Sequence, residues 1–112
     1  MLFRSKRFLG RKGNCFRVVA VSEVLAFVSE NGLTKLLAAG DHYWVSPTLN
    51  DLEARLDAAQ FCRISRAAIV NLDAIEELTP SASGNGEVTL RDGTKLEVSR
   101  RRYKDLTDRL AG

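Results

Sequence analysis

Two dipeptides, Asn31-Gly32 and Asp92-Gly93, constrain the fold more than any other feature of this sequence. Each lies between two short runs rich in apolar and β-branched residues. Asn-Gly and Asp-Gly are the strongest short signals for a two-residue hairpin, because these residues tolerate the positive φ angles of a type I′ turn. The dipeptides therefore predict two antiparallel strand pairs. The predicted pairs are 24–30 with 33–39, and 87–91 with 94–99.

The remaining apolar runs are short and are predicted to be further strands, at 15–21, 42–46, 61–64, 67–72 and 75–79. Ser46 as N-cap and Pro47 at the first helical position predict a helix over about 47–59. Leu49, Leu52 and Leu56 would share its apolar face. A second helix is predicted over about 100–110, where the face is Tyr103, Leu106 and Leu110. The pattern favours a mainly β fold, neither βαβ nor helix-turn-helix.

A length of 112 residues fits one small domain. Residues 1–14 form a basic segment, interpreted as either a strand or a linker remnant, and the domain proper is expected over 15–112. The net charge is +3, but the charges are segregated, with basic residues dominating 1–22 and 93–112 and acidic residues dominating 73–92. Such segregation favours an anionic partner, although a solvated basic surface without a partner gives the same pattern.

The sequence contains no signature of catalysis, and we expect neither an enzyme nor a metal or cofactor site. There is no GxSxG motif and no glycine-rich phosphate loop. Cys15 and Cys62 lack metal-ligand spacing and lie in apolar runs, which predicts two buried, reduced thiols in a cytoplasmic protein. The single His42 stands alone, and the adjacent Glu76 and Glu77 would point to opposite faces of a strand. No apolar run has the length of a membrane span.

Three arginines, Arg100 to Arg102, open the C-terminal helix, with Ser99 as the expected N-cap. Cations at a helix N-terminus oppose the helix dipole by about 0.3–1 kcal/mol each. A bound phosphate would reverse this balance, because the free N–H groups and the arginine forks both favour an anion. The other interpretation is that arginine is a good helix former and tolerates solvent.

Two further groups of basic residues are weaker candidates. Arg63 and Arg66 bracket Ser65 in a short connection. Arg66 precedes a run that is expected to be buried, so it either pairs with an acid or projects outward. Thr34 and Lys35 follow the Asn31-Gly32 turn and are expected on an exposed hairpin tip. A lysine in such a place is usually only solvated.

Two longer motifs, in this order, resemble the LytTR DNA-binding domain, the output module of a class of bacterial response regulators. They are F-x-R-x-x-R-x-x-I-V-N at Phe61–Asn71 and D-G-x-x-L-x-V-S-R at Asp92–Arg100. The resemblance covers about residues 15–110. It implies an elongated antiparallel architecture of about ten short strands, in which loops enter the major groove of double-stranded DNA in place of a recognition helix.

The resemblance also implies roles for individual residues in a sequence-specific, cytoplasmic transcription regulator. The residues expected to contact bases are Thr34, Arg66 and Arg101. Those expected to contact phosphates are Lys35, Ser65, Ser99, Arg100, Arg102 and Lys104. Relatives usually bind direct repeats as dimers, so paired sites and a homodimer on DNA are expected.

This sequence departs from the family pattern at two of the expected contact segments. Many relatives have histidine, a polar residue and serine where this chain has Ser65, Arg66 and Ala67, and some have a larger side chain in place of Thr34. The operator sequence therefore stays open. An alternative function is a LytTR-like protein-interaction module that inhibits or partners another regulator. A basic stripe joining Lys35, Arg66 and Arg101 would favour DNA, whereas an apolar patch there would favour a protein partner.

Overall fold

The computed structural model describes residues 6–111, which form ten strands, two α-helices and two short 3₁₀ turns. The strands are β1 (Arg7–Lys12), β2 (Cys15–Ala20), β3 (Val24–Glu30), β4 (Leu33–Ala38), β5 (Asp41–Val45), β6 (Phe61–Ser65), β7 (Ala68–Asn71), β8 (Ile75–Pro80), β9 (Gly86–Leu90) and β10 (Lys95–Val98). The helices are α1 (Leu49–Arg55) and α2 (Arg100–Ala111), and the 3₁₀ turns are Val21–Glu23 and Leu72–Ala74. In this part of the chain, no helix is long and apolar enough to cross a membrane.

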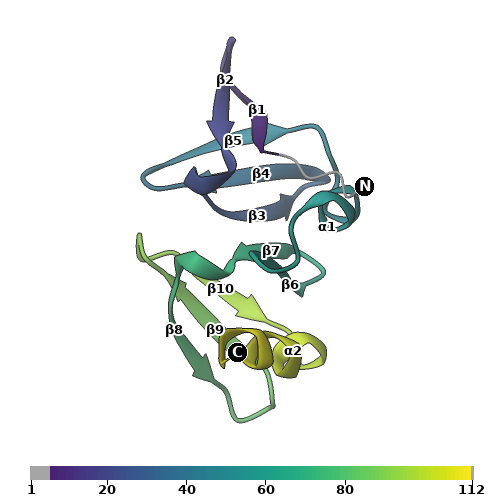
Figure 1. The fold of residues 1–112 in the computed structure, drawn as a ribbon, viewed down its shortest axis with the longest axis vertical. Helices are drawn as coiled ribbons and strands as arrows, with labels where there is room; N and C mark the ends of the chain where they lie inside the picture. The colour runs from purple at the N-terminus through teal and green to yellow at the C-terminus, as the bar shows by residue number, and fades with distance from the viewer. Residues whose placement is uncertain (1–5, 112) are drawn as a thin grey trace.

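The strands form two sheets, and the paired strands are antiparallel. The larger sheet has the order β2-β1-β5-β4-β3-β7-β6, and the smaller has the order β10-β9-β8. The molecule measures 43 × 33 × 24 Å. Figure 1 shows the β1–β2 hairpin at one end of its long axis and the smaller sheet with α2 at the other. The prediction of an elongated, mainly β fold with a central and a C-terminal helix is confirmed.

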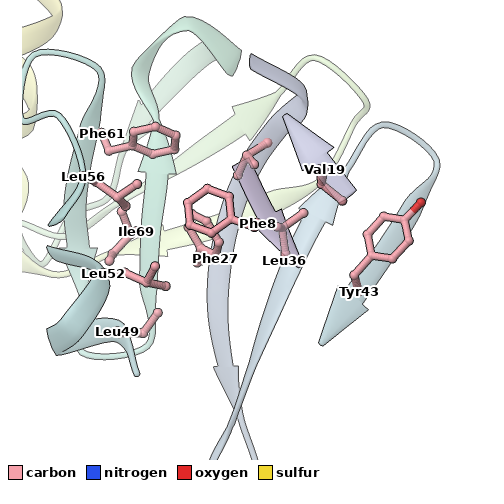
Figure 2. Close-up of a cluster of buried hydrophobic side chains, with 11 residues drawn as sticks. Phe8, Val19, Phe27, Leu36, Tyr43, Leu49, Leu52, Leu56, Phe61 and Ile69 are labelled. Atoms are coloured by element: carbon pink, nitrogen blue, oxygen red, sulfur yellow. The ribbon is translucent and has the colours of Figure 1, made fainter. Parts of the chain in front are cut away.

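Two apolar clusters hold these layers together. The first lies between one face of the larger sheet and α1, where Phe27 packs edge-on against Phe8 with ring centroids 5.1 Å apart (Figure 2). The predicted leucine face of α1, Leu49, Leu52 and Leu56, is buried here. The second cluster joins β3, β6 and β7 to the smaller sheet and to Leu106 of α2. Leu110 is 39% exposed and does not anchor the helix as expected, because α2 is buried at Leu106 and not in its last turn.

The two dipeptide signals have different outcomes. Asn31 and Gly32 both have positive φ, 53° and 78°, and Glu30 pairs with Leu33, so the type I′ prediction is confirmed there. At Asp92-Gly93 it is wrong. Only Gly93 has a positive φ, 93°, and the Leu90 N–H donates to the Thr94 carbonyl at 2.8 Å. The loop therefore has three residues, and in such loops a left-handed residue follows an ordinary turn.

The central helix is shorter than predicted at both ends. Its N-cap is Thr48, whose hydroxyl accepts a hydrogen bond from the Asp51 N–H at 3.1 Å while the Asp51 carboxylate accepts from the Thr48 N–H at 3.2 Å. This reciprocal capping box places the start two residues after Ser46. The helix ends because Leu56 turns to an extended conformation with ψ 153°. The Asp57 carboxylate then accepts from the Ala59 N–H in the following turn.

The N-terminal basic segment contains a strand, since Arg7–Lys12 forms β1 and pairs along its whole length with β2. Residues 1–5 of the segment lie outside the described residues. Cys62 is buried, as predicted, but Cys15 is exposed, and the prediction of a second buried thiol is wrong. The reason is that β2 lies at the edge of the larger sheet, where only Val19 of its six residues is buried.

Candidate nucleic-acid interface

Main-chain hydrogen bonds tie together the three segments in which the candidate residues lie. The Ser29 N–H, at the end of β3, donates to the Ala67 carbonyl in the β6–β7 turn at 2.8 Å. The Ser99 N–H, just before α2, donates to the Ile64 carbonyl in β6 at 2.8 Å. The β3–β4 hairpin, the β6–β7 turn and the start of α2 therefore meet on one side of the molecule.

Arg63 holds the β6–β7 turn in shape. Its Nε donates to the Ser65 carbonyl at 2.7 Å, and its Nη2 donates to the Arg66 carbonyl at 2.9 Å. Its Nη1 reaches α1, at 3.1 Å from the Asn50 Oδ1 and 2.9 Å from the Glu53 Oε1. With its side chain only 10% exposed, Arg63 pairs with an acid and does not project outward. It is a positioning residue that joins the turn to the helix.

Arg66 and Arg101 have the opposite character. Both are exposed, and neither guanidinium forms a hydrogen bond or ion pair with another of residues 6–111. They line the same hollow of about 670 Å³, together with Ser65 and Ser99. The structure thus brings two of the three predicted base-contacting residues to one concave surface, with three of the predicted phosphate contacts, Ser65, Ser99 and Arg102, beside them.

Two acids also line this hollow. Glu53 lies between two cations, with its carboxylate 2.9 Å from Arg63 Nη1 and 3.6 Å from Arg102 Nη1. The Arg102 side chain therefore forms an ion pair with Glu53 of α1 and is still 41% exposed. Glu97 of β10 is exposed in the same hollow as Arg101 and has no ion-pair partner among the described residues. The hollow is net positive, with Arg63, Arg66, Arg101 and Arg102 against these two carboxylates.

The prediction that Thr34 and Lys35 lie on an exposed tip is wrong. Thr34 is 7% exposed, and the Lys35 side chain is 18% exposed. The Lys35 Nζ is 3.0 Å from Glu30 Oε1 and 5.2 Å from the centroid of the Trp44 ring. The reason is that β4 begins at Leu33, so both residues already pair with β5. The exposed tip is residues 31–33. Gly32 and Thr34 both border a smaller hollow that Arg66 also lines.

The remaining basic residues at the start of α2 point in other directions. Arg102 donates its N–H to the Ser99 carbonyl at 3.0 Å, which places Ser99 directly before the first turn, as predicted. Arg100 lies over the β8–β9 loop, where a Cβ added to Gly84 would be 2.8 Å from its Cδ. Lys104 is 86% exposed and pairs with Asp108 at 3.0 Å, one turn further along the helix. Neither residue lines the hollow.

Sequence reasoning did not assign a role to Arg63, Asn50 or Glu97. Arg63 was named only as one of the arginines that bracket Ser65, and its pairing depends on Glu53, ten residues away in α1. Of the two possibilities left open for Arg66, the structure shows an exposed side chain without an acidic partner among the described residues. Asn50 and Glu97 carry no local signal of a site. Within the described residues, no group of histidine, cysteine and acidic side chains could hold a metal ion.

Comparison with known proteins shows the family to which the chain belongs. The family model of the LytTr DNA-binding domain matches residues 14–111. The chain is 29% identical to the sensory transduction protein LytT of Bacillus subtilis over 84% of its own length, and 30% identical to the sensory transduction protein LytR of Streptococcus agalactiae over 83%. It spans 39% and 38% of those two proteins.

A solved structure shows the same fold. It is a LytTr DNA-binding domain from Bacillus cereus, part of a protein described as a methyl-accepting/DNA response regulator. The two structures superpose with a TM-score of 0.90 at 18% sequence identity, over 96% of this chain and 99% of that one. The family match extends from the last residues of the β1–β2 loop to the end of α2. The chain therefore belongs to the family of LytTr DNA-binding domains.

Proposed function

We propose that this domain binds double-stranded DNA sequence-specifically, by placing the β6–β7 turn and the start of α2 in the major groove. The observation that carries the proposal is the pair of exposed arginines, Arg66 and Arg101, in one hollow on main-chain segments that are hydrogen-bonded to each other. A guanidinium that has no partner in the protein keeps its donors for an external acceptor. Its planar fork matches the O6 and N7 atoms of guanine.

The residues around this pair are suited to phosphates. Ser65, Ser99 and Arg102 lie at the border of the hollow, and the free N–H groups at the start of α2 favour an anion. Arg100 and Lys104, on the flanks of the helix, would contact phosphates further along the duplex. Lys35 and Thr34 have a lesser part in this proposal, because Lys35 is paired with Glu30 and Thr34 is only 7% exposed.

Glu97 would help the hollow to discriminate between duplex sequences. A carboxylate next to DNA repels phosphates, but it accepts a hydrogen bond from the N4 amino group of cytosine. Placed beside Arg101, Glu97 would weaken binding to arbitrary duplexes more than binding to the correct one.

The position of exposed apolar side chains supports DNA over a protein partner at this surface. Among the described residues, the large exposed hydrophobic side chains are Leu9, Phe16, Val18, Leu33 and Leu110. None of them lines the hollow that contains Arg66 and Arg101. The hollow is therefore basic and not apolar, but Lys35, the third member of the expected basic stripe, does not line it.

Transcription regulation is the role that follows from such binding, as part of a response regulator in the bacterial cytoplasm. The relatives carry names of sensory transduction proteins, and the chain spans less than half of their length. We propose further that two copies bind paired direct repeats, as a homodimer on DNA.

The test is selection of bound duplexes from a random pool, followed by binding titrations of the selected duplex at several salt concentrations. We expect specific binding that weakens as salt rises, and footprints at two repeats in the same orientation. The matched control is Arg91→Ala, which removes an exposed arginine from the β9–β10 loop and should leave affinity unchanged. The proposal would be overturned if no duplex showed salt-dependent binding.

A further inference from the structure

The β1–β2 hairpin exposes an apolar face at the opposite edge of the larger sheet from the Arg66 hollow. In the register of the hairpin, Leu9 pairs with Val18 and Arg11 pairs with Phe16, so these four side chains share one face. Leu9 is 60% exposed, Phe16 63% and Val18 62%. The other face of the same hairpin supplies Phe8 and Val19 to the core. The outer face is thus apolar without a partner inside the described molecule.

The face continues across the neighbouring strand. Arg11 also pairs with Trp44 of β5, which places Trp44 on the same side of the sheet as Phe16, with Arg11 between them. Leu33, 53% exposed, lines the same groove as Leu9, Phe16 and Trp44. A set of apolar side chains that is contiguous over several strands is uncommon on a free surface and indicates an interaction site.

The backbone of β2 is also available. β2 is an edge strand of the described sheet, and its six residues pair with β1 without a bulge. It contains no proline and no lysine, the usual protection of an edge. Lys12 and Cys15 close the two-residue loop and form a hydrogen-bonded pair of the ladder. Because such pairs alternate, Phe16 and Val18 direct their N–H and C=O groups toward the open side.

Charge decides between the partners that such an edge could take. Residues 6–20 contain five basic residues, Lys6, Arg7, Arg11, Lys12 and Arg17, and no acid. A second copy of the hairpin would bring these like charges together. The groove beside the apolar face is lined by Arg7, Arg11 and Arg55, with no acidic side chain. The complementary partner is a strand that alternates apolar and acidic residues.

We propose that the β2 edge, with Leu9, Phe16 and Val18, is a docking site for an extended acidic segment of a partner protein, which adds to the sheet as a further strand. The backbone of Phe16 and Val18 supplies the ladder hydrogen bonds, and the apolar face takes alternate side chains of the segment. The flanking Arg7 and Arg11 select acidic residues at its remaining positions. This site centres on the opposite edge of the larger sheet from the Arg66 hollow, and the two surfaces meet only at the hairpin residues Gly32 and Thr34 and at Thr48.

The test uses a synthetic octapeptide that alternates valine and glutamate, capped at both ends, and the same peptide with lysine in place of glutamate. Binding is measured by fluorescence polarisation, and the site is mapped by amide chemical shifts. We expect the glutamate peptide to bind at least about tenfold more tightly than the lysine peptide. The largest shifts should fall on residues 16–20.

The decisive variant is Val18→Pro, with Val18→Thr as its matched control. Proline is tolerated on an edge strand where the N–H faces outward, so the hairpin should fold, but it removes a donor and blocks strand addition. Val18→Pro should weaken peptide binding about tenfold or more, and Val18→Thr less than about threefold. Circular dichroism confirms that both variants are folded.

Three results would overturn the proposal. One is no binding of the glutamate peptide, or equal loss in both Val18 variants. Another is a dimer of the free chain, seen by sedimentation equilibrium, that Val18→Pro dissociates, because the occupant would then be a second copy. The third is a loss of duplex DNA affinity in Val18→Pro, which would make the hairpin part of the DNA surface. Since peptide binding is measured without DNA, its outcome does not depend on the proposed function.

Discussion

The β6–β7 turn and the β3–β4 hairpin are both short connections with basic residues, yet the fold uses them differently. In the turn, Arg63 supplies the internal hydrogen bonds and Arg66 is left exposed. In the hairpin, the single cation Lys35 is held by Glu30 and covers Trp44. The difference shows that a cation is available to an external anion only where another residue satisfies the local structure. Its sequence position near a turn is not sufficient.

Removal of the internal cation of the β6–β7 turn should have the largest effect. We expect Arg63→Ala to lower the free energy of unfolding by about 2–3 kcal/mol, because it leaves the Ser65 and Arg66 carbonyls and Glu53 without their donor. Lys35→Ala, on the hairpin side of the comparison, should cost less than about 1 kcal/mol. Urea denaturation measures both. Equal losses in the two variants would remove the distinction between the turn and the hairpin.

Removal of an exposed arginine should affect DNA binding and not folding. Arg66→Ala and Arg101→Ala should each weaken binding to the selected duplex by about 1–3 kcal/mol and relax the preference at one base pair. The free energy of unfolding should change by less than about 0.5 kcal/mol. Titration of single-base variants of the operator gives the specificity, and a uniform loss over all duplexes would assign the arginine to a phosphate instead.

Removal of the charge of Glu97, the exposed acid of the hollow, should strengthen DNA binding and not weaken it. Glu97→Gln removes a carboxylate beside Arg101 without changing the shape of the side chain. We expect binding to random duplexes to strengthen by about 0.5–1 kcal/mol, and the ratio of specific to non-specific affinity to fall. Glu87→Gln, its cross-strand neighbour in β9, is the control. An unchanged ratio would show that Glu97 takes no part in discrimination.

The two lysines distinguish a cation used by the fold from one on an open helix face. Lys104→Ala should weaken binding to all duplexes about equally and lower the salt slope by about one. Lys35→Ala should leave the slope almost unchanged, because its charge is already paired with Glu30. Affinities at several salt concentrations provide the slopes. A larger change of the salt slope in Lys35→Ala than in Lys104→Ala would show that the β3–β4 hairpin contacts DNA.

The buried Cys62 and the exposed Cys15 provide the same contrast between a group inside the fold and one open to solvent, and we expect the smallest change in stability here. Burial raises the pKa of Cys62 from 9.0 to about 11. Above pH 9 the unfolded state loses the Cys62 proton, whereas the folded state keeps it. The contribution of the protonated Cys62 thiol to the free energy of unfolding is therefore fully present below pH 9 and is lost as the pH rises toward 11. Denaturation of wild type and Cys62→Ala between pH 8 and 10.5 should show a shallower decline in the variant. At pH 8, iodoacetamide should label the exposed Cys15 about a hundredfold faster than Cys62.

The sequence was sufficient for the elements whose signals are local. The type I′ turn at Asn31-Gly32 and the leucine face of α1 follow from φ preference and spacing alone. It was insufficient wherever two signals compete or a distant residue decides. Ser46 and Thr48 both suit an N-cap, and Asp51 selects Thr48. The dipeptide Asp92-Gly93 specifies a positive φ but not the number of residues in the loop.

The candidate site shows the same division. Arg66 and Arg101 were identified from the family motif, and the structure places them in one hollow. The fate of Lys35 depended on its pairing with Trp44 in the next strand, and that of Arg63 on an acid in α1. Such pairings are fixed by the tertiary fold. Spacing along the chain contains no information about them.

The main-chain bonds from Ser29 to Ala67 and from Ser99 to Ile64 have a consequence for how such domains diversify. Neither bond involves a side chain. The main-chain arrangement that positions residues 66 and 101 therefore does not depend on which side chains are present there. A substitution at either position can alter the preferred base without refolding the scaffold. Operator preference can therefore change one residue at a time, while the relative placement of the two contacts is inherited intact.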